Sequence, residues 1–391
     1  MSKIAFFCIP AFGHTNPTLE VVRELINRGN EVWYYSYDML KDEILSTGAK
    51  YISCDAYDIQ MTLNPEDYER MSKDLALSME ILVNTTLALD NAIMEEMKNW
   101  HPDCIVADSM AVWGKLVASK LQIPFISSTT TFAFNRYSSK IMKQSLLEGI
   151  RMMISMSKAN KSLQKLRDKG YSVKNALSII ANSNDTNTIV YTSPEFQPCA
   201  ETFSNKYTFV GPSIRPYKAM ELKSNRELIY ISLGTVNNQN ISFYQNCIRA
   251  FRNSRYEVII SVGNMTDVDK LGEIPENITI KKYVDQLAVL QQAKLFITHC
   301  GMNSVNEALY FKVPLILFPQ TKEQEGVAYR VHELDAGIYL ENCDSDTIIE
   351  AVETINTDIK YRESAERIAN SFHRCGGPKL AADKVIEVAE K

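Results

Sequence analysis

The stretch "KLFITHCGMNSVNEAL" (294–309) runs from an apolar strand into a helix with only a short turn between them. A continuous apolar run of this kind is typical of a strand that is buried on both faces of a parallel sheet. The turn contains Gly301, Asn303 and Ser304, which strand-to-helix turns often use for backbone reasons. It also contains His299, which those reasons do not explain. The fold around the turn decides what this histidine does.

Apolar runs and helical stretches alternate through both halves of the chain. In the second half, a predicted helix near 241–253 accompanies predicted strands at 227–235, 256–263, 278–282, 294–300, 313–319 and 337–340. In the first half, a predicted helix over 16–30 accompanies predicted strands at 3–9, 31–36, 49–55, 103–108 and 124–129. This alternation predicts an α/β fold with two doubly wound, Rossmann-like domains.

The limits of the two domains follow from a break in this pattern. Residues 211–226 contain two prolines, a glycine and several charges without clear periodicity, which is typical of a linker. We therefore expect an N-terminal domain over 1–212, a linker over 213–226 and a C-terminal domain over 227–378.

The composition excludes several classes of protein. The 391 residues are 45% apolar and 23% charged, and the net charge of -5 gives no sign of a nucleic-acid partner. No apolar run is long enough to span a membrane. The eight cysteines form no C-x-x-C, and the N-terminus enters a strand without a signal-peptide layout. We therefore expect a cytoplasmic protein with reduced thiols, as a monomer or homodimer.

A first candidate site follows from the strand order. Open parallel sheets bind ligands beyond the carboxyl ends of their strands, where the strand order reverses. With the common order 3-2-1-4-5, His14 after the first strand and Asp108 at the end of the fourth would face each other. A carboxylate that holds one imidazole nitrogen makes the other nitrogen a general base. The alternative is a loop histidine that only caps or packs.

A second crevice is predicted where "SLGT" (232–235) meets the turn after residue 298. The N-terminus of a helix attracts phosphate through its free N–H groups and its dipole. The groups that would assist are those of Ser232, Thr235, His299, Gly301, Asn303 and Ser304. The alternative is a tight turn in which Asn303 or Ser304 caps the helix. If the two halves face each other, both crevices open into one cleft.

Two Rossmann-like halves also suggest a dinucleotide-dependent oxidoreductase. The fifteen glycines, however, include neither G-x-G-x-x-G nor G-x-x-x-x-G-K-[ST]. These arrangements carry the pyrophosphate fingerprint and the P-loop, so their absence weighs against this alternative.

The stretch "THCGMNSVNEALYFKVPLILFPQTKEQ" (298–324) resembles the nucleotide-sugar signature of family 1 glycosyltransferases, which have the GT-B fold. "PAFGHTNPTLEVVRELINRGNEVWYYS" (10–36) is similar to the N-terminus of their bacterial macrolide-type members. "FVGPS", "ISLGT" and "YVDQLAVLQQA" fall at the expected places between, so the resemblance covers essentially the whole chain. It implies two domains facing across a cleft, with a last helix over 379–391 that packs back on the N-terminal domain.

The resemblance also implies roles for matching residues. The catalytic base falls on His14, its carboxylate partner on Asp108, and the diphosphate binders on Thr235, His299, Asn303 and Ser304. The other positions are the ribose acid Glu307 with Gln286 near it, the uracil-stacking ring of Tyr283, the base-reading backbone of Val284, and the sugar-reading pair Glu323 and Gln324.

The sequence departs from the family's plant pattern at four positions. Tyr283 and Met302 stand where Trp is usual, Asp285 stands where Pro is usual, and Glu323 stands where Asp is common. Without the Pro we expect a looser uracil loop. The longer side chain of Glu323 would shift its carboxylate against the sugar.

The implied reaction is inverting transfer of glucose from UDP-glucose to a hydroxyl of a hydrophobic small molecule, such as a macrolide, flavonoid or other polyphenol. We expect no cofactor and no metal, since no Asp/Glu/His cluster with metal spacing lies near the turn. Met142, Met152, Met153 and Met156 either pack in a core or line an adaptable acceptor pocket. A nucleotide-sugar epimerase and a non-catalytic nucleotide-sugar-binding protein remain as alternatives.

Overall fold

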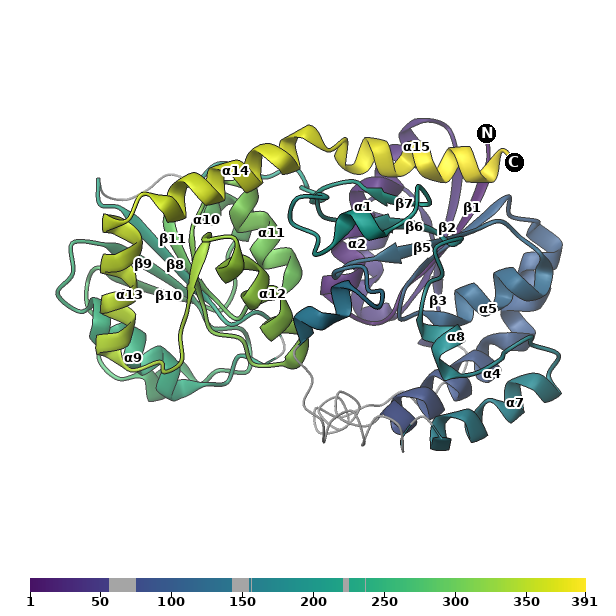
Figure 1. The fold of residues 1–391 in the computed structure, drawn as a ribbon, viewed down its shortest axis with the longest axis horizontal. Helices are drawn as coiled ribbons and strands as arrows, with labels where there is room; N and C mark the ends of the chain where they lie inside the picture. Colours follow the sequence, from purple (N-terminus) through teal and green to yellow (C-terminus); the bar gives the residue numbers. More distant parts are fainter. Residues whose placement is uncertain (56–74, 143–154, 156, 221–224, 236) are drawn as a thin grey trace. The chain divides into compact units, whose positions relative to one another are not determined.

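The computed structural model describes residues 1–55, 75–142, 155, 157–220, 225–235 and 237–391 (Figure 1). The chain forms two compact units. Unit 1 comprises Met1–Tyr191, Cys199–Ser213 and Cys375–Lys391, and unit 2 comprises Thr192–Pro198 and Ile214–Arg374.

The division between the units differs in three places from the expected domain limits, and one of them is that residues 375–378 lie in unit 1 although we expected them in the C-terminal domain. The segment Thr192–Pro198 lies in unit 2, although we expected it in the N-terminal domain. The residues from Ile214 onward, which we expected to begin a linker, also belong to unit 2. Each unit is described by itself below.

Parallel strands form the sheet of unit 1 in the order β3-β2-β1-β4-β5-β6-β7. They are β1 (Lys3–Phe7), β2 (Glu31–Ser36), β3 (Lys50–Ser53), β4 (Cys104–Asp108), β5 (Phe125–Thr129), β6 (Asn187–Val190) and β7 (Tyr207–Phe209). The predicted order of the first five strands is confirmed, and β1 pairs with β4. The sequence pattern does not predict β6 and β7, because runs of 4 and 3 residues are too short to show a period.

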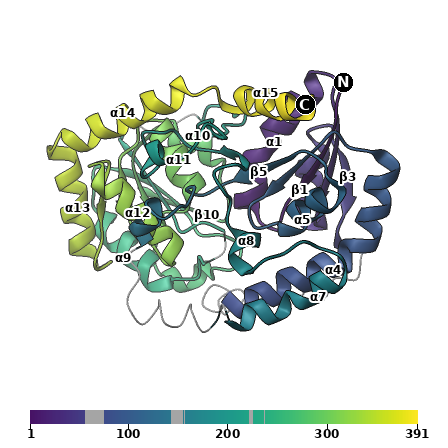
Figure 2. The ribbon, with the colours of Figure 1, turned by 45° about the vertical axis from the view of Figure 1, so that its right-hand side comes forward.

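Helices cover both faces of this sheet (Figures 1 and 2). On one face, α1 (Phe12–Asn27) packs against α15 (Gly377–Ala389), and both contact the side of β1 that carries Ile4 and Phe6. On the other face, α4 (Leu75–Trp100) and α5 (Val112–Leu121) pack together over Phe7. The shorter helices of unit 1 are α2 (Lys41–Leu45), α7 (Gln164–Asp168) and α8 (Ala176–Ile180).

Helix α1 begins one turn earlier than the predicted start at residue 16. The N–H of Thr15 donates to the carbonyl of Ala11 at 3.0 Å and closes a first turn that begins at Phe12. Pro17 therefore lies inside the helix. The prediction was wrong because Pro favours the first helical position but is not confined to it. As a result, His14 lies on the first turn of α1 and not in a loop.

The sheet of unit 2 has the order β10-β9-β8-β11-β12-β13, again as predicted for its first five strands. The strands are β8 (Leu228–Ser232), β9 (Glu257–Ser261), β10 (Ile278–Lys281), β11 (Ala293–Thr298), β12 (Leu315–Leu317) and β13 (Gly337–Tyr339). The helices are α9 (Ile241–Phe251), α10 (Gln286–Leu290), α11 (Met302–Tyr310), α12 (Lys322–Glu333), α13 (Ser345–Thr357) and α14 (Lys360–Arg374). Because all these strands are parallel, the loops after β8, β11 and β12 leave the same edge of the sheet.

The eight cysteines all lie in described segments and are free thiols. In those same segments, no helix is long and apolar enough to cross a membrane.

Candidate functional site

The structure brings His14 and Asp108 together at the carboxyl ends of β1 and β4. Nδ1 of His14 lies 2.7 Å from Oδ2 of Asp108, and their side chains are 21% and 1% exposed. An ionised carboxylate only accepts hydrogen bonds, so the imidazole donates its Nδ1 proton to Asp108. The neutral ring then carries its lone pair on Nε2, which is the atom able to take up a proton.

Two further contacts fix the geometry of this pair. The backbone N–H of Met110 donates to Oδ1 of Asp108 at 2.8 Å, so both carboxylate oxygens are used. The hydroxyl oxygen of Thr130 lies 3.2 Å from Nδ1 of His14. Thr130 directly follows β5, which is the neighbour of β4. The imidazole is therefore held in place from two strand ends.

A buried thiol lies close to the pair. Cys8 is 1% exposed, and its sulfur lies 3.3 Å from the hydroxyl of Thr15 on α1. Burial, followed by the nearby Asp108 carboxylate, raises the pKa of Cys8 far above its ordinary value. The thiol is therefore neutral, and this leaves the imidazole as the basic group beside Asp108.

In unit 2, His299 lies between two glycines at the end of β11. A Cβ atom on Gly234 would lie 2.6 Å from the imidazole, and a Cβ on Gly301 would lie 2.6 Å from its Nε2. Any larger residue at either position would push the ring away. We expected Gly301 to admit a phosphate to the backbone, and the structure adds a second reason for glycine, which is the ring itself.

The environment of His299 keeps its ring uncharged. Burial lowers the pKa of His299 to about 4, and the backbone of Ser232 acts weakly in the opposite direction. At neutral pH the ring is therefore a neutral hydrogen-bonding group. The hydroxyl of buried Ser232 accepts the N–H of Gly234 at 3.2 Å and shapes the loop that ends at the exposed Thr235.

Helix α11 begins directly after this turn. Its N-cap is Gly301, which is in an extended conformation and has no side chain that could cap the helix. Asn303 and Ser304 therefore lie inside the first turn and not at the N-cap position. The first-turn N–H groups of a helix and its dipole favour an anion at this end.

A hydrogen-bond network joins the starts of α10 and α11. The amide nitrogen of Gln286 donates to Glu307 at 2.6 Å and to the hydroxyl of Ser304 at 3.2 Å. The hydroxyl of Tyr230 on β8 donates to the amide oxygen of Gln286 at 3.2 Å. Burial raises the pKa of Glu307 to about 7, although the bond from Gln286 opposes that rise. Glu307 is thus a carboxyl group that titrates near neutrality.

The segment between β10 and α10 presents an exposed ring. Tyr283 is 61% exposed, whereas Val284 beside it is half-buried. The guanidinium of Arg215 donates to both carboxylate oxygens of Asp285, at 2.6 and 3.4 Å. We expected a looser loop where Asp285 replaces Pro. The structure shows an exposed ion pair at this residue, and the looseness of the loop stays a prediction.

Glu323 and Gln324 lie in the first turn of α12, after β12. The hydroxyl of Thr321 accepts the N–H of Gln324, and the amide oxygen of Gln324 accepts the N–H of Gln320 at 2.8 Å. This stretch is therefore a capped helix start and not a loop. Glu323 is exposed there.

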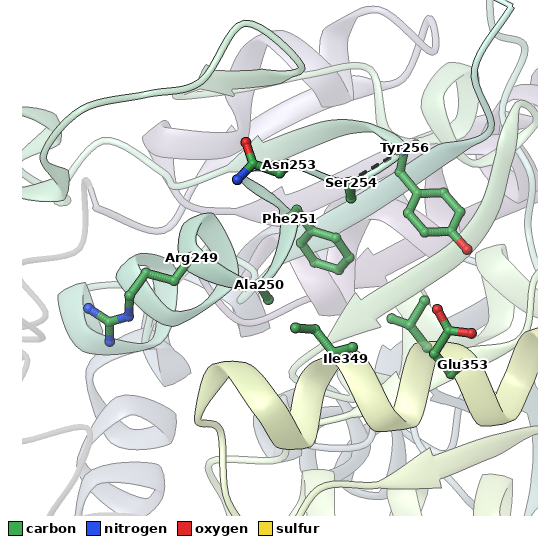
Figure 3. A pocket seen from close by; sticks show the side chains of 9 residues that line it. Arg249, Ala250, Phe251, Asn253, Ser254, Tyr256, Ile349 and Glu353 are labelled. Carbon is green, nitrogen blue, oxygen red and sulfur yellow. Dashed lines mark hydrogen bonds between the residues drawn. The ribbon is translucent and has the colours of Figure 1, made fainter.

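A pocket of about 240 Å³ in unit 2 contains none of the predicted site residues (Figure 3). It lies between the end of α9, the loop before β9 and the helix α13, with Phe251, Tyr256 and Ile349 in its wall. A loop that precedes a strand leaves the amino edge of the sheet. The pocket is therefore on the opposite edge from His299.

Some predicted features belong to different units or lie outside the described residues. His14 and Asp108 lie in unit 1, and the other predicted site residues lie in unit 2. Of the four methionines considered for an acceptor pocket, Met142 is half-buried, and Met152, Met153 and Met156 lie outside the described residues. Across the described part of the chain, no three His, Cys, Asp or Glu side chains are grouped so as to hold a metal ion.

Sequence reasoning missed three residues that contact the site. Thr130 directly follows a strand. The rule that ligands bind beyond the carboxyl ends of parallel strands, which selected Asp108, therefore also applies to Thr130. Tyr230 carries a hydroxyl in an otherwise apolar strand, which is a weak signal. Arg215 gives no signal, because the sequence does not show which partner an exposed guanidinium reaches.

Comparison with known proteins gives consistent matches over the whole chain. Residues 248–388 match the family described as "Erythromycin biosynthesis protein CIII-like, C-terminal domain". The NDP-glycosyltransferase YjiC of Bacillus subtilis (strain 168) is 35% identical over 399 residues, which cover 99% of this chain and 97% of that protein. The uncharacterized UDP-glucosyltransferase YojK of the same strain is 30% identical and covers 100% of this chain and 98% of its own length. The crystal structure of the calicheamicin glycosyltransferase CalG4 is 27% identical, with a TM-score of 0.83 over 100% of this chain and 98% of that one.

Proposed function

Since the chain belongs to the family 1 glycosyltransferases of GT-B fold, in their bacterial macrolide-type group, we propose that it transfers glucose from UDP-glucose to a hydroxyl group of a hydrophobic small molecule. The similarity to YojK, which is named as an uncharacterized UDP-glucosyltransferase, supports the choice of donor. The observation that carries the proposal is the contact of 2.7 Å between His14 and Asp108.

His14 acts as the general base in this reaction. Its Nε2 takes the proton of the acceptor hydroxyl while the oxygen attacks the anomeric carbon from the face opposite to the diphosphate. The new C–O bond forms as the bond to the diphosphate breaks, and UDP leaves with the electron pair. Asp108 stabilises the imidazolium that results. A positioned base of this kind contributes roughly 10²–10⁴-fold in rate.

The leaving diphosphate is held by unit 2. The start of α11 offers backbone N–H groups, and neutral His299, in the tautomer with its proton on Nε2, offers a side-chain donor beside Gly234 and Gly301. Asn303, Ser304 and Thr235 add polar groups of the same turn and the facing loop. These dipoles stabilise the charge that develops on the diphosphate without a metal ion.

The remaining predicted site residues bind the uridine and the sugar. The exposed ring of Tyr283 stacks on uracil, and the backbone of Val284 meets the edge of the base. Glu307, held by Gln286, accepts the ribose hydroxyls. Glu323 and Gln324 bind the hydroxyls of glucose.

Large apolar side chains exposed on the segments that follow β4 and β5 support a hydrophobic acceptor. Met110, whose N–H holds Asp108, is 42% exposed. Phe134 and Tyr137, on the segment that follows Thr130, are each 40% exposed. Exposed apolar groups on these two segments suit a flat or bulky apolar acceptor.

The test is mass spectrometry of reactions that contain UDP-glucose and a panel of macrolide, flavonoid and other phenolic acceptors. We expect a mass increase of one hexose on at least one acceptor and its loss in His14→Ala. An acceptor-free reaction is the control, since release of UDP from UDP-glucose without an acceptor would instead indicate an epimerase. Binding of UDP-glucose without transfer to any acceptor would contradict the proposal.

A further inference from the structure

We propose that Arg215 is a positioning residue for the nucleotide, which acts through Asp285 on the segment Tyr283–Gln286. The inference rests on the proposed function, because it assumes that this segment receives the uridine. Arg215 itself touches neither substrate in this proposal. Its ion pair with Asp285 supplies the rigidity that a proline at position 285 would supply covalently.

The geometry of the ion pair suits an anchor. Nη2 of Arg215 lies 2.6 Å from Oδ1 of Asp285, and Nη1 lies 3.4 Å from Oδ2. Two N–H groups thus meet the two oxygens of one carboxylate, which fixes orientation as well as distance. Nη1 also donates to the backbone carbonyl of Pro216 at 3.1 Å, so the arginine is tied to its own segment.

The segment that carries Arg215 is itself fastened to unit 2. The ring of Tyr217 meets the ring of Phe311 edge-on, with centroids 5.4 Å apart. Phe311 directly follows α11, the helix whose first turn we assign to the diphosphate. The segment from which Arg215 reaches Asp285 is therefore attached to the same helix.

Asp285 is a point at which such an anchor affects binding. It is the N-cap of α10, and the next residue, Gln286, bonds Glu307 and Ser304. Tyr283, whose ring is exposed, lies two residues before Asp285 in the segment that follows β10. A shift of Asp285 would move the stacking ring and the amide that orients the ribose carboxylate together.

The electrostatics support the same assignment. Burial raises the pKa of Glu307, while Arg215 lowers it and Asp285 raises it by a smaller amount. The arginine therefore favours the ionised form of the carboxylate that would accept the ribose hydroxyls. Arg215 and Asp285 are 51% and 38% exposed, so salt will screen the pair.

The experiment is a double-mutant cycle of Arg215→Ala and Asp285→Pro, read by calorimetric titration with UDP-glucose. Asp285 has a φ of -70°, which proline adopts without strain. At low ionic strength we expect Arg215→Ala to weaken UDP-glucose binding about 2- to 5-fold, the range of an exposed ion pair. In the Asp285→Pro background, the same substitution should cause no further loss.

Steady-state kinetics and a matched control separate positioning from general damage. Arg215→Ala should raise the KM for the donor and leave kcat at saturating donor unchanged. The gap from wild type should shrink as salt is added. Arg252→Ala, which removes another exposed pair in unit 2 at 3.0 Å from Glu273, should change neither parameter.

Unchanged affinity in Arg215→Ala, or an equal loss in the proline background, would overturn the inference. Failure of the wild-type protein to bind UDP-glucose would overturn the proposed donor instead. If Asp285→Pro does not fold, Asp285→Asn takes its place in the cycle, because it keeps the shape and removes the charge. Arg215→Ala should then add nothing to Asp285→Asn.

Discussion

Nδ1 of His14 lies 2.7 Å from Oδ2 of Asp108, although 94 residues separate the two along the chain. The first turn of α1 carries the imidazole, and the last residue of β4 carries the carboxylate. The N–H of Met110 occupies the other carboxylate oxygen. Both carboxylate oxygens of Asp108 are therefore occupied. We expect Asp108 to affect the reaction only through the imidazole of His14.

This arrangement predicts unequal losses from the two residues. His14→Ala should lower kcat at least ~100-fold, because the base is removed. Asp108→Asn should cost less, because the imidazole remains but loses the charge that orients it and stabilises its protonated form. Single-turnover rates at saturating UDP-glucose measure both effects.

The affinity for UDP serves as the control, since the predicted diphosphate contacts all lie in unit 2. It should stay within about 2-fold of the wild-type value in both variants. Turnover retained within a few-fold in His14→Ala would rule out the base.

The pairing of His14 with Asp108 was predictable because it depends only on strand order and on the shared edge of parallel strands. Thr130 obeys the same rule, but it stands in "SSTTT", and sequence does not tell which of several hydroxyls reaches the ring. The ion pair of Arg215 with Asp285 depends on side-chain reach between distant segments. No periodicity reports such a contact.

The second prediction concerns the close approach of Gly301 to His299. A Cβ at position 301 would lie 2.6 Å from Nε2, and the φ of Gly301 is -60°, which alanine tolerates. Gly301→Ala should therefore act through the ring and not through backbone strain. We expect the affinity for UDP-glucose to fall about 10-fold or more, as for other small displacements of a binding group.

A double-mutant cycle isolates this effect. In a His299→Ala background the added methyl group meets no ring, so Gly301→Ala should cost little further affinity. Thermal unfolding of each variant checks that the fold is kept. Additive losses in the cycle would show that Gly301 acts on the ligand directly and not through His299.

The third prediction is a pH dependence set by Glu307, whose pKa is raised to about 7 by burial. Ribose hydroxyls that donate to the carboxylate favour its ionised form, so binding lowers this pKa and releases a proton. The affinity for UDP-glucose should therefore rise with pH up to about 7 and stay level above it, with a slope of at most ~10-fold per pH unit below.

Glu307→Gln is the matched variant for this measurement. It should bind more weakly at high pH and lose the slope. His299 does not contribute to this pH dependence, because burial lowers its pKa to about 4 and the ring is neutral near pH 7. A slope that survives in Glu307→Gln would assign the titration to another group.

The last prediction concerns sugar choice, and it rests on Glu323 and Gln324 at the start of α12. The amide oxygen of Gln324 already accepts the N–H of Gln320, so the amide nitrogen is what this residue can offer a sugar. The exposed carboxylate of Glu323 can accept from two sugar hydroxyls. A hexose whose 3- and 4-hydroxyls are equatorial should suit this pair best, which favours glucose. Once the bound sugar covers the pair, a polar group left unpaired costs about 1–3 kcal/mol, so UDP-galactose should be used roughly 10–100-fold less well.

Glu323→Ala should shrink that ratio, because the penalty for mispairing disappears together with the carboxylate. Glu325→Ala is the matched control, since Glu325 is a second carboxylate on the same turn and lies 3.1 Å from Lys322. It should leave the ratio unchanged. The measurement is kcat/KM for UDP-glucose and UDP-galactose in the wild type and both variants. If the ratio is the same in Glu323→Ala as in the wild type, sugar choice is made by other residues, and the first turn of α12 then serves only to begin the helix.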